Sequence, residues 1–103
     1  MNKLHLWFLE QWDKNEEFDE NNKGYIKCFE TGKKLYTENY REISLCYSHI
    51  LNKKKYSKYK MKDWNLKIVS PESHQLFELY PKKAIHQYTL YQKLLEDHYN
   101  KLI

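Results

Sequence analysis

The sequence predicts a small α+β protein with helices at both ends and short strands between them. Its length of 103 residues suits one modest hydrophobic core, so residues 1–103 are expected to form a single domain. Apolar residues recur at helical spacing near both ends of the chain. Short β-prone runs lie between them, at residues 24–29, 43–50 and 66–69.

The N-terminal segment, residues 1–22, predicts a helix that passes into an acidic loop. A first amphipathic helix is expected over about residues 2–17, because four apolar residues share one helical face: Leu4, Trp7, Phe8 and Trp12. Residues 13–23 are rich in acidic residues and Asn, which favours a loop.

The next segment predicts a strand and a tight turn. Residues 24–29 alternate like a strand, and residues 30–33 suit a turn because Gly32 can take a positive φ without steric cost. Residues 35–40 fit either a return strand or a helical turn.

The middle of the chain predicts a second pair of strands followed by a helix. Residues 43–50 and 66–69 are the strands, and residues 51–64 connect them. Ser70 can cap a helix with Pro71 in its first turn, where the missing N–H is no loss. This helix should run to about Tyr80, because Pro81 stops it.

The C-terminal segment, residues 84–103, predicts a last helix over about residues 84–102. Its expected stripe would pack against the core or form the seam of a homodimer through the C-terminal helix. The stripe consists of Ile85, Tyr88, Gln92, Leu95, Tyr99 and Leu102.

Charge is unevenly distributed along the chain. Residues 1–22 hold two lysines and six acidic residues, a net charge of −4, so the total of +4 leaves +8 on residues 23–103. A basic body of this kind suits a polyanion, and DNA is the expected partner. The lysine-rich connection alone would also fit a solvated loop.

No stretch approaches the roughly 20 apolar residues of a membrane span, and the N-terminus lacks a signal-peptide pattern. The sequence therefore predicts a soluble protein without a membrane partner. We expect Cys28 and Cys46 to stay reduced in the cytoplasm.

Three polar residues mark the middle segment. His49 ends one predicted strand, Asn65 begins the next, and His74 follows nine positions later on the predicted helix. This order resembles the HNH (ββα-metal finger) endonuclease family over about residues 26–80. The resemblance implies a ββα finger flanked by the terminal helices, and an origin in a bacterial or phage-infected cell.

The predicted helix also carries a metal-ligand pattern. His74 and Glu78 are one helical turn apart, so both side chains leave the same face. An imidazole and a carboxylate with open positions suit a divalent ion that keeps waters, Mg²⁺ or Mn²⁺.

The resemblance extends to the zinc knuckle that surrounds many HNH fingers. Cys28 and Thr31 look like its upstream Cys-x-x-Cys, and Ser70 and Ser73 occupy the two downstream positions. Three of the four thiolates are therefore missing, and no structural zinc is expected. Core packing would have to hold the fold instead.

A variant of the family in some restriction endonucleases is similar at Ser48-His49-Ile50 and at the Ser70-Pro71 helix start. In other branches an Asp or His precedes the base and helps to bind the metal. Ser48 is a weaker ligand than either.

The resemblance implies a metal-dependent hydrolysis of phosphodiester bonds in DNA. His49 would be the general base, Asn65 would brace its loop, and His74 and Glu78 would bind the metal. Backbone contacts would come from the lysines of the connection: Lys53, Lys54, Lys55, Lys58, Lys60 and Lys62. The alternative is a catalytically decayed finger that only binds DNA or protein.

Overall fold

Helix α1, Lys3–Asn15, forms as its apolar spacing predicts, although it ends two residues early. The computed structural model describes residues 2–99. The Asn2 side chain caps the helix by accepting a hydrogen bond from the backbone N–H of His5 at 2.8 Å. The inner face of α1 packs on strand β4 (Tyr47–His49), where the rings of Phe8 and Tyr47 stack with centroids 4.6 Å apart.

A three-stranded antiparallel sheet follows, in the order β1-β2-β3. Its strands are β1 (Glu17–Phe18), β2 (Gly24–Lys27) and β3 (Lys34–Tyr36). The predicted turn between β2 and β3 is confirmed, because Gly32 has a φ of 78° and its N–H bonds the Cys28 carbonyl at 2.8 Å. The ambiguous segment divides into β3 and the short helix α2 (Thr37–Tyr40).

A separate two-stranded antiparallel sheet pairs β4 with β5, Leu66–Ile68, with His49 opposite Leu66. The expected strand over residues 43–50 is shorter than predicted, because Ser44–Cys46 form a 3-10 turn that leaves Leu45 exposed. The connection contains two further 3-10 turns, Ser57–Tyr59 and Asp63–Asn65.

Helix α3, Pro71–Leu79, begins as the sequence predicts. The Ser70 side chain accepts a hydrogen bond from the Ser73 N–H at 3.2 Å, and Pro71 occupies the first turn. Pro81–Lys83 form a 3-10 turn, after which helix α4, Ile85–Leu94, continues into a π-helical turn at Leu95–Tyr99. Leu102 lies outside the described residues.

The predicted stripe on the C-terminal helix is confirmed only in part, because Leu95 packs against a buried cluster and Tyr99 packs edge to face on Tyr56, but other stripe residues are exposed. Ile85 is 65% exposed and Gln92 is exposed, whereas Ala84, Gln87 and Leu94 are buried. The buried face differs because Gln87 points inward, where it forms hydrogen bonds with Ser48 and Ser73. A pattern of apolar residues alone cannot predict the burial of a polar residue. A homodimer through this helix stays a prediction.

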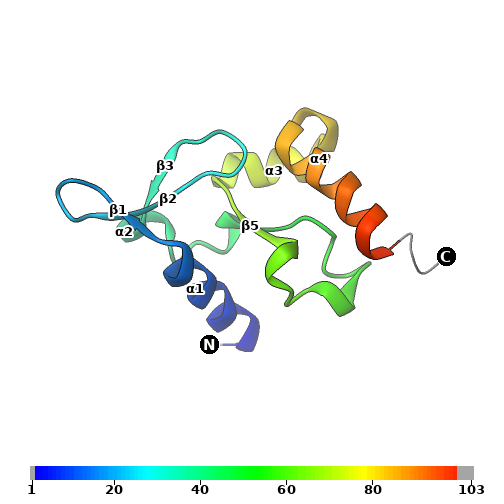
Figure 1. Cartoon of the computed structure of the whole chain (residues 1–103), viewed down its shortest axis with the longest axis horizontal. Coiled ribbons are helices and arrows are strands. Elements are labelled where there is room, and N and C mark those ends of the chain that lie inside the picture. The colour runs from blue at the N-terminus through cyan, green and yellow to red at the C-terminus, as the bar shows by residue number, and fades with distance from the viewer. Residues whose placement is uncertain (1, 100–103) are drawn as a thin grey trace.

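The elements form an elongated α+β protein whose described residues contain two hydrophobic clusters. Figure 1 shows α1 and the three-stranded sheet toward one end, α4 toward the other, and β5 between them. One cluster packs α1 on both sheets and includes Trp12, Leu35 and Val69. The second joins the connection to α4 and includes Leu51, Tyr59 and Leu94. None of the helices in residues 2–99 combines the length and apolar character needed to cross a membrane.

Candidate active site

The predicted base and the predicted metal ligands line one open cleft of about 1150 Å³. His49 reaches it from the end of β4, and His74 and Glu78 reach it from α3. These three residues, which the sequence places in two separate segments, therefore share one solvent-accessible space. Asn65 does not line it.

The His49 ring is fixed in orientation. Its Nε2 lies 2.7 Å from the Lys60 carbonyl oxygen, and its face packs near the rings of Trp7 and Phe8. A carbonyl only accepts hydrogen bonds, so in the neutral ring Nε2 carries the hydrogen and donates it. Nδ1 is then the nitrogen with a free lone pair, which a general base requires.

The surroundings of His49 also favour its neutral form. Burial lowers the pKa of His49 below its usual 6.5, and the charges of Lys53 and His74 lower it further, while the hydrogen bond to Lys60 acts in the opposite direction. The imidazole is therefore an unprotonated base at neutral pH.

Asn65 is completely buried and joins the two ends of the connection. Its Nδ2 donates to the carbonyls of Leu51 at 3.0 Å and Tyr59 at 3.2 Å, and its Oδ1 accepts from the Leu51 N–H at 2.7 Å. Leu51 lies two residues after His49, and Tyr59 directly precedes Lys60, which bonds His49. Asn65 thus braces the backbone on both sides of the His49 ring.

His74 and Glu78 form a pair on α3, with His74 Nε2 2.9 Å from Glu78 Oε1. Two donors of this kind fit a weakly held Mg²⁺ or Mn²⁺, which usually takes few protein ligands and completes its shell with water and phosphate. His74 Nδ1 is buried without a hydrogen-bond partner among the described residues, although metal-binding histidines almost always have one there. No group of three or more potential ligands occurs within residues 2–99. The donor set therefore suits low rather than high affinity.

The basic residues of the cleft differ partly from the predicted set. Lys53 and Lys55 line it, whereas the other four predicted lysines are exposed outside its lining: Lys54, Lys58, Lys60 and Lys62. Lys82 and Lys83, in the turn between α3 and α4, also line the cleft. The sequence analysis did not predict this pair, because the only feature that marks it is two consecutive lysines after Pro81.

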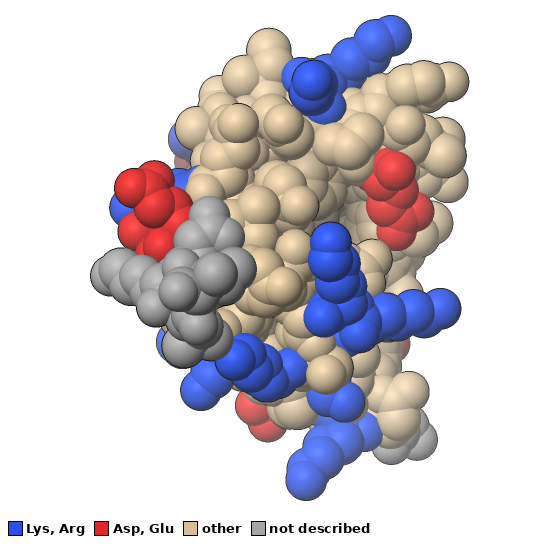
Figure 2. Space-filling model, turned by 90° about the vertical axis from the view of Figure 1, so that its right-hand side faces the viewer, with Lys and Arg blue, Asp and Glu red and all other residues tan. Residues whose placement is uncertain are grey.

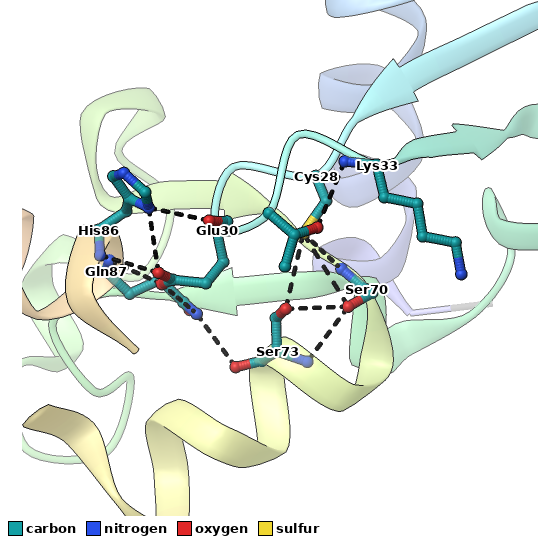
Figure 3. Close-up of polar contacts among 8 residues, drawn as sticks. Cys28, Glu30, Lys33, Ser70, Ser73, His86 and Gln87 are labelled. Atoms are coloured by element: carbon teal, nitrogen blue, oxygen red, sulfur yellow. Dashed lines mark hydrogen bonds and ion pairs between the residues drawn. The ribbon is translucent and has the colours of Figure 1, made fainter. Parts of the chain in front are cut away.

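The four positions that resemble a zinc knuckle in the sequence come together as a hydrogen-bonded group, which we name the Cys28 cluster: Cys28, Thr31, Ser70 and Ser73. Figure 3 shows Cys28, Ser70 and Ser73 of this cluster. The Cys28 Sγ lies 3.9 Å from Ser70 Oγ and 3.7 Å from Ser73 Oγ, and the Ser70 N–H donates to it at 3.2 Å. Burial raises the pKa of the Cys28 thiol, but hydrogen bonds from Thr31, Ser70 and Ser73 outweigh burial and lower it overall.

Cys46 differs from Cys28, because burial raises the pKa of its thiol to about 12. Both cysteines are buried as free thiols. A thiol held protonated in this way is a packing residue.

A second polar network lies beside the Cys28 cluster and is centred on Gln87 (Figure 3). Gln87 has no exposed surface. Its Oε1 accepts from Ser48 Oγ at 2.7 Å, and its Nε2 donates to the Ser73 carbonyl at 3.0 Å. Ser48 and Ser73 directly precede His49 and His74. Ser48 is therefore held by Gln87 rather than left free as a ligand, and α4 helps to position the site.

Glu30, in the turn between β2 and β3, connects this network to the three-stranded sheet. Its carboxylate accepts hydrogen bonds from the N–H groups of His86 at 2.9 Å and Gln87 at 3.0 Å, at the start of α4. Burial raises the pKa of Glu30, but these hydrogen bonds outweigh burial and lower it overall. The sequence offered no signal for Glu30 or Gln87, because neither belongs to a spacing pattern.

The chain matches no protein-family model, and neither a curated protein nor a solved structure is significantly similar to it.

Proposed function

We propose that this protein is a metal-dependent endonuclease of the HNH type, which hydrolyses phosphodiester bonds in DNA. The observation that carries the proposal is the shared cleft, where His49 with a lone pair on Nδ1 faces the same space as the His74–Glu78 pair. Metal-dependent hydrolysis of a phosphodiester requires at least a general base and a metal-binding group close to the bound phosphate. The cleft offers candidates for both, together with lysines.

The order of elements supports the family assignment. Antiparallel β4 and β5 are followed directly by α3, the order expected of a ββα finger. The base ends the first strand, Asn65 precedes the second, and the ligand pair projects from the helix. The Cys28 cluster fills the place of the zinc knuckle with hydrogen bonds.

The proposed mechanism follows from the tautomer, the hydrogen bonds and the charge of the residues in and around the cleft. His49 takes a proton from the attacking water through Nδ1, while its Nε2–H stays bonded to the Lys60 carbonyl. Asn65 keeps that carbonyl in place through the neighbouring Tyr59. Lys53, Lys55, Lys82 and Lys83 bind phosphates and orient the strand in the cleft.

His74 and Glu78 are the residues that would hold the divalent ion. When bound, this ion would stabilise negative charge on the scissile phosphate and on the leaving oxygen.

The direct test is cleavage of a plasmid by the purified protein with Mg²⁺ or Mn²⁺. We expect nicked or linear product, and a loss of at least about 10²-fold in His49→Ala, the effect of removing a general base. His5→Ala is the matched control, because His5 lies on α1 outside the cleft lining. Absence of cleavage with every divalent ion tried, or an unchanged rate in His49→Ala, would refute the proposal.

A catalytically decayed binding module is the second candidate. It is favoured because His74 Nδ1 has no hydrogen-bond partner within residues 2–99 and because Ser48 is engaged with Gln87. This alternative predicts DNA or protein binding that is insensitive to EDTA and to His49→Ala.

A further inference from the structure

The wall of the cleft beyond the candidate catalytic residues is aromatic. Phe77 and Tyr80 contribute to it from the end of α3, Tyr88 and Tyr91 from α4, and Tyr56 from the connection. The lining is predominantly apolar. Phosphate contacts alone do not require such a surface, because they are made by lysines and polar groups.

The aromatic rings form a continuous surface. The rings of Tyr88 and Tyr91 stack with centroids 6.0 Å apart, and Phe77 meets Tyr91 edge to face at 6.3 Å. The Tyr56 side chain lies close enough to Tyr91 to add to the effect of burial in raising the pKa of Tyr91. The surface therefore extends from the end of α3, next to Glu78, across α4 to the connection.

Tyr80 lines the same cleft and is the most exposed of these five aromatic residues. It is 58% exposed, two residues beyond Glu78, and the Lys83 Nζ lies 5.0 Å from its ring centroid. The lysine lies over one face of the ring, and the exposed remainder of Tyr80 is available to a ligand, so a cation and an aromatic surface are presented together. Proteins bind unpaired nucleotides in this way, with bases on aromatic rings and phosphates on cations.

Basic side chains border the cleft at two places in the fold. Lys53 and Lys55 belong to the connection, which lies below α4 in Figure 1, and Lys82 and Lys83 belong to the turn between α3 and α4, at the top of that figure. Figure 2 shows the face at this end of the molecule, where basic side chains stand above and below a broad uncharged area. This arrangement suits a polyanion whose charged groups contact the basic side chains while its uncharged parts occupy the area between them.

We propose that the cleft binds unpaired nucleotides, so that the substrate is single-stranded DNA or a locally unpaired segment of a duplex. The inference rests on the proposed nuclease function and adds its substrate class. A base stacked on Tyr80 would lie in the same cleft as Glu78 and His74. In a paired duplex the base faces are occupied by neighbouring base pairs, so the aromatic surface would contribute little.

The test is an equilibrium binding measurement in EDTA, which needs no catalysis. Fluorescently labelled single-stranded DNA, the matched duplex, and the same duplex with a mismatched bubble are titrated by fluorescence anisotropy at constant salt. We expect the single strand and the bubble to bind at least about tenfold more tightly than the duplex.

The aromatic contribution is tested by substitution. Tyr80→Ala should weaken single-strand binding by about 5- to 150-fold, the effect of losing one stacked base, while Tyr80→Phe should retain most of it. Phe18→Ala is the matched control, because Phe18 is 60% exposed on β1, outside the cleft lining, and its loss should leave binding unchanged.

Equal or tighter duplex binding, or an unchanged affinity in Tyr80→Ala, would overturn the inference. Absence of binding to any DNA would also overturn it and would point to an apolar segment of a protein as the occupant. If single-strand preference is found but no divalent ion supports cleavage, the nuclease proposal fails and this inference stands.

Discussion

The Cys28 cluster and the cleft site of His49, His74 and Glu78 are both polar, yet they differ in how their atoms are used. In the cluster, Cys28, Ser70 and Ser73 bond one another and neighbouring backbone groups. In the cleft, His49 Nδ1 keeps a lone pair that an external group can use. In a structural site the polar atoms form hydrogen bonds with one another, whereas a site for an external ligand leaves some polar atoms without a partner inside the protein.

The largest expected effect comes from converting the cluster into a metal site. We predict that the triple variant Thr31→Cys, Ser70→Cys and Ser73→Cys binds Zn²⁺ together with Cys28. Cys28 Sγ already lies 3.7 Å and 3.9 Å from the two serine oxygens. Tetrahedral zinc with bonds near 2.3 Å needs sulfur atoms about 3.8 Å apart.

Zinc at 1,000 times its Kd should stabilise this variant by about 4 kcal/mol, measured as a rise in Tm on adding Zn²⁺. Absorption of the Co²⁺ complex would report thiolate ligation. The same variant carrying Cys28→Ser is the control and should lose most of the effect. Equal Tm with and without zinc would show that the four positions do not converge as described.

A smaller effect is expected at Gln87, which lies between the two regions. Gln87→Met keeps the side-chain length but leaves the Ser48 hydroxyl and the Ser73 carbonyl without this partner. Leaving such buried groups unsatisfied should lower the free energy of unfolding by about 1–3 kcal/mol, measured by urea denaturation. If the protein is a nuclease as proposed, cleavage should also fall under conditions where the variant remains folded, because Ser48 and Ser73 directly precede the candidate catalytic residues His49 and His74.

Gln92→Met is the control for this variant, because Gln92 is exposed on the same helix and its substitution should change stability by less than about 0.5 kcal/mol. A Gln87 variant that is destabilised yet cleaves normally would limit Gln87 to a structural role.

The smallest expected effect is a shift in pH dependence. Because the pKa of His49 is lowered from 6.5, its neutral form persists below that pH, and the acidic limb of the pH–rate profile should lie below pH 6.5. Lys53→Gln removes a positive charge that lowers this pKa, so the pKa should rise and the limb should move to higher pH.

The profile is measured as kcat/KM against pH, with Lys62→Gln as the control outside the cleft lining. A limb at or above pH 6.5, or one that Lys53→Gln moves downward, would show that His49 is not the titrating base.

Much of the fold could be predicted because its signals are local. The capped start of α3, the turn at Gly32 and the spacing of Trp7, Phe8 and Trp12 each follow from neighbouring residues. The strand over residues 43–50 was overestimated because β-prone composition does not show that Ser44–Cys46 turn.

The candidate site was predictable only in part. His49, His74 and Glu78 follow a recognisable spacing, and the structure brings them to one cleft. Glu30 and Gln87 were missed because their contacts join distant segments. The Lys82–Lys83 pair was missed because only the folded chain brings its turn to the cleft. Gln87 in particular is a polar residue in a buried position, and an apolar pattern assigns such a residue to solvent.

The hydrogen bond from the Gln87 N–H to Glu30 spans 57 positions in sequence, which bears on how the protein folds. Closing so long a loop has a large entropic cost, and contacts of this kind form late unless local structure forms first. Helices α1 and α3 and the β2–β3 turn rely on hydrogen bonds between residues close in sequence, so they can begin to form before such long-range contacts. The docking of α4 on Glu30 then completes the site, so the cleft is expected to be among the last parts of the molecule to acquire its final form.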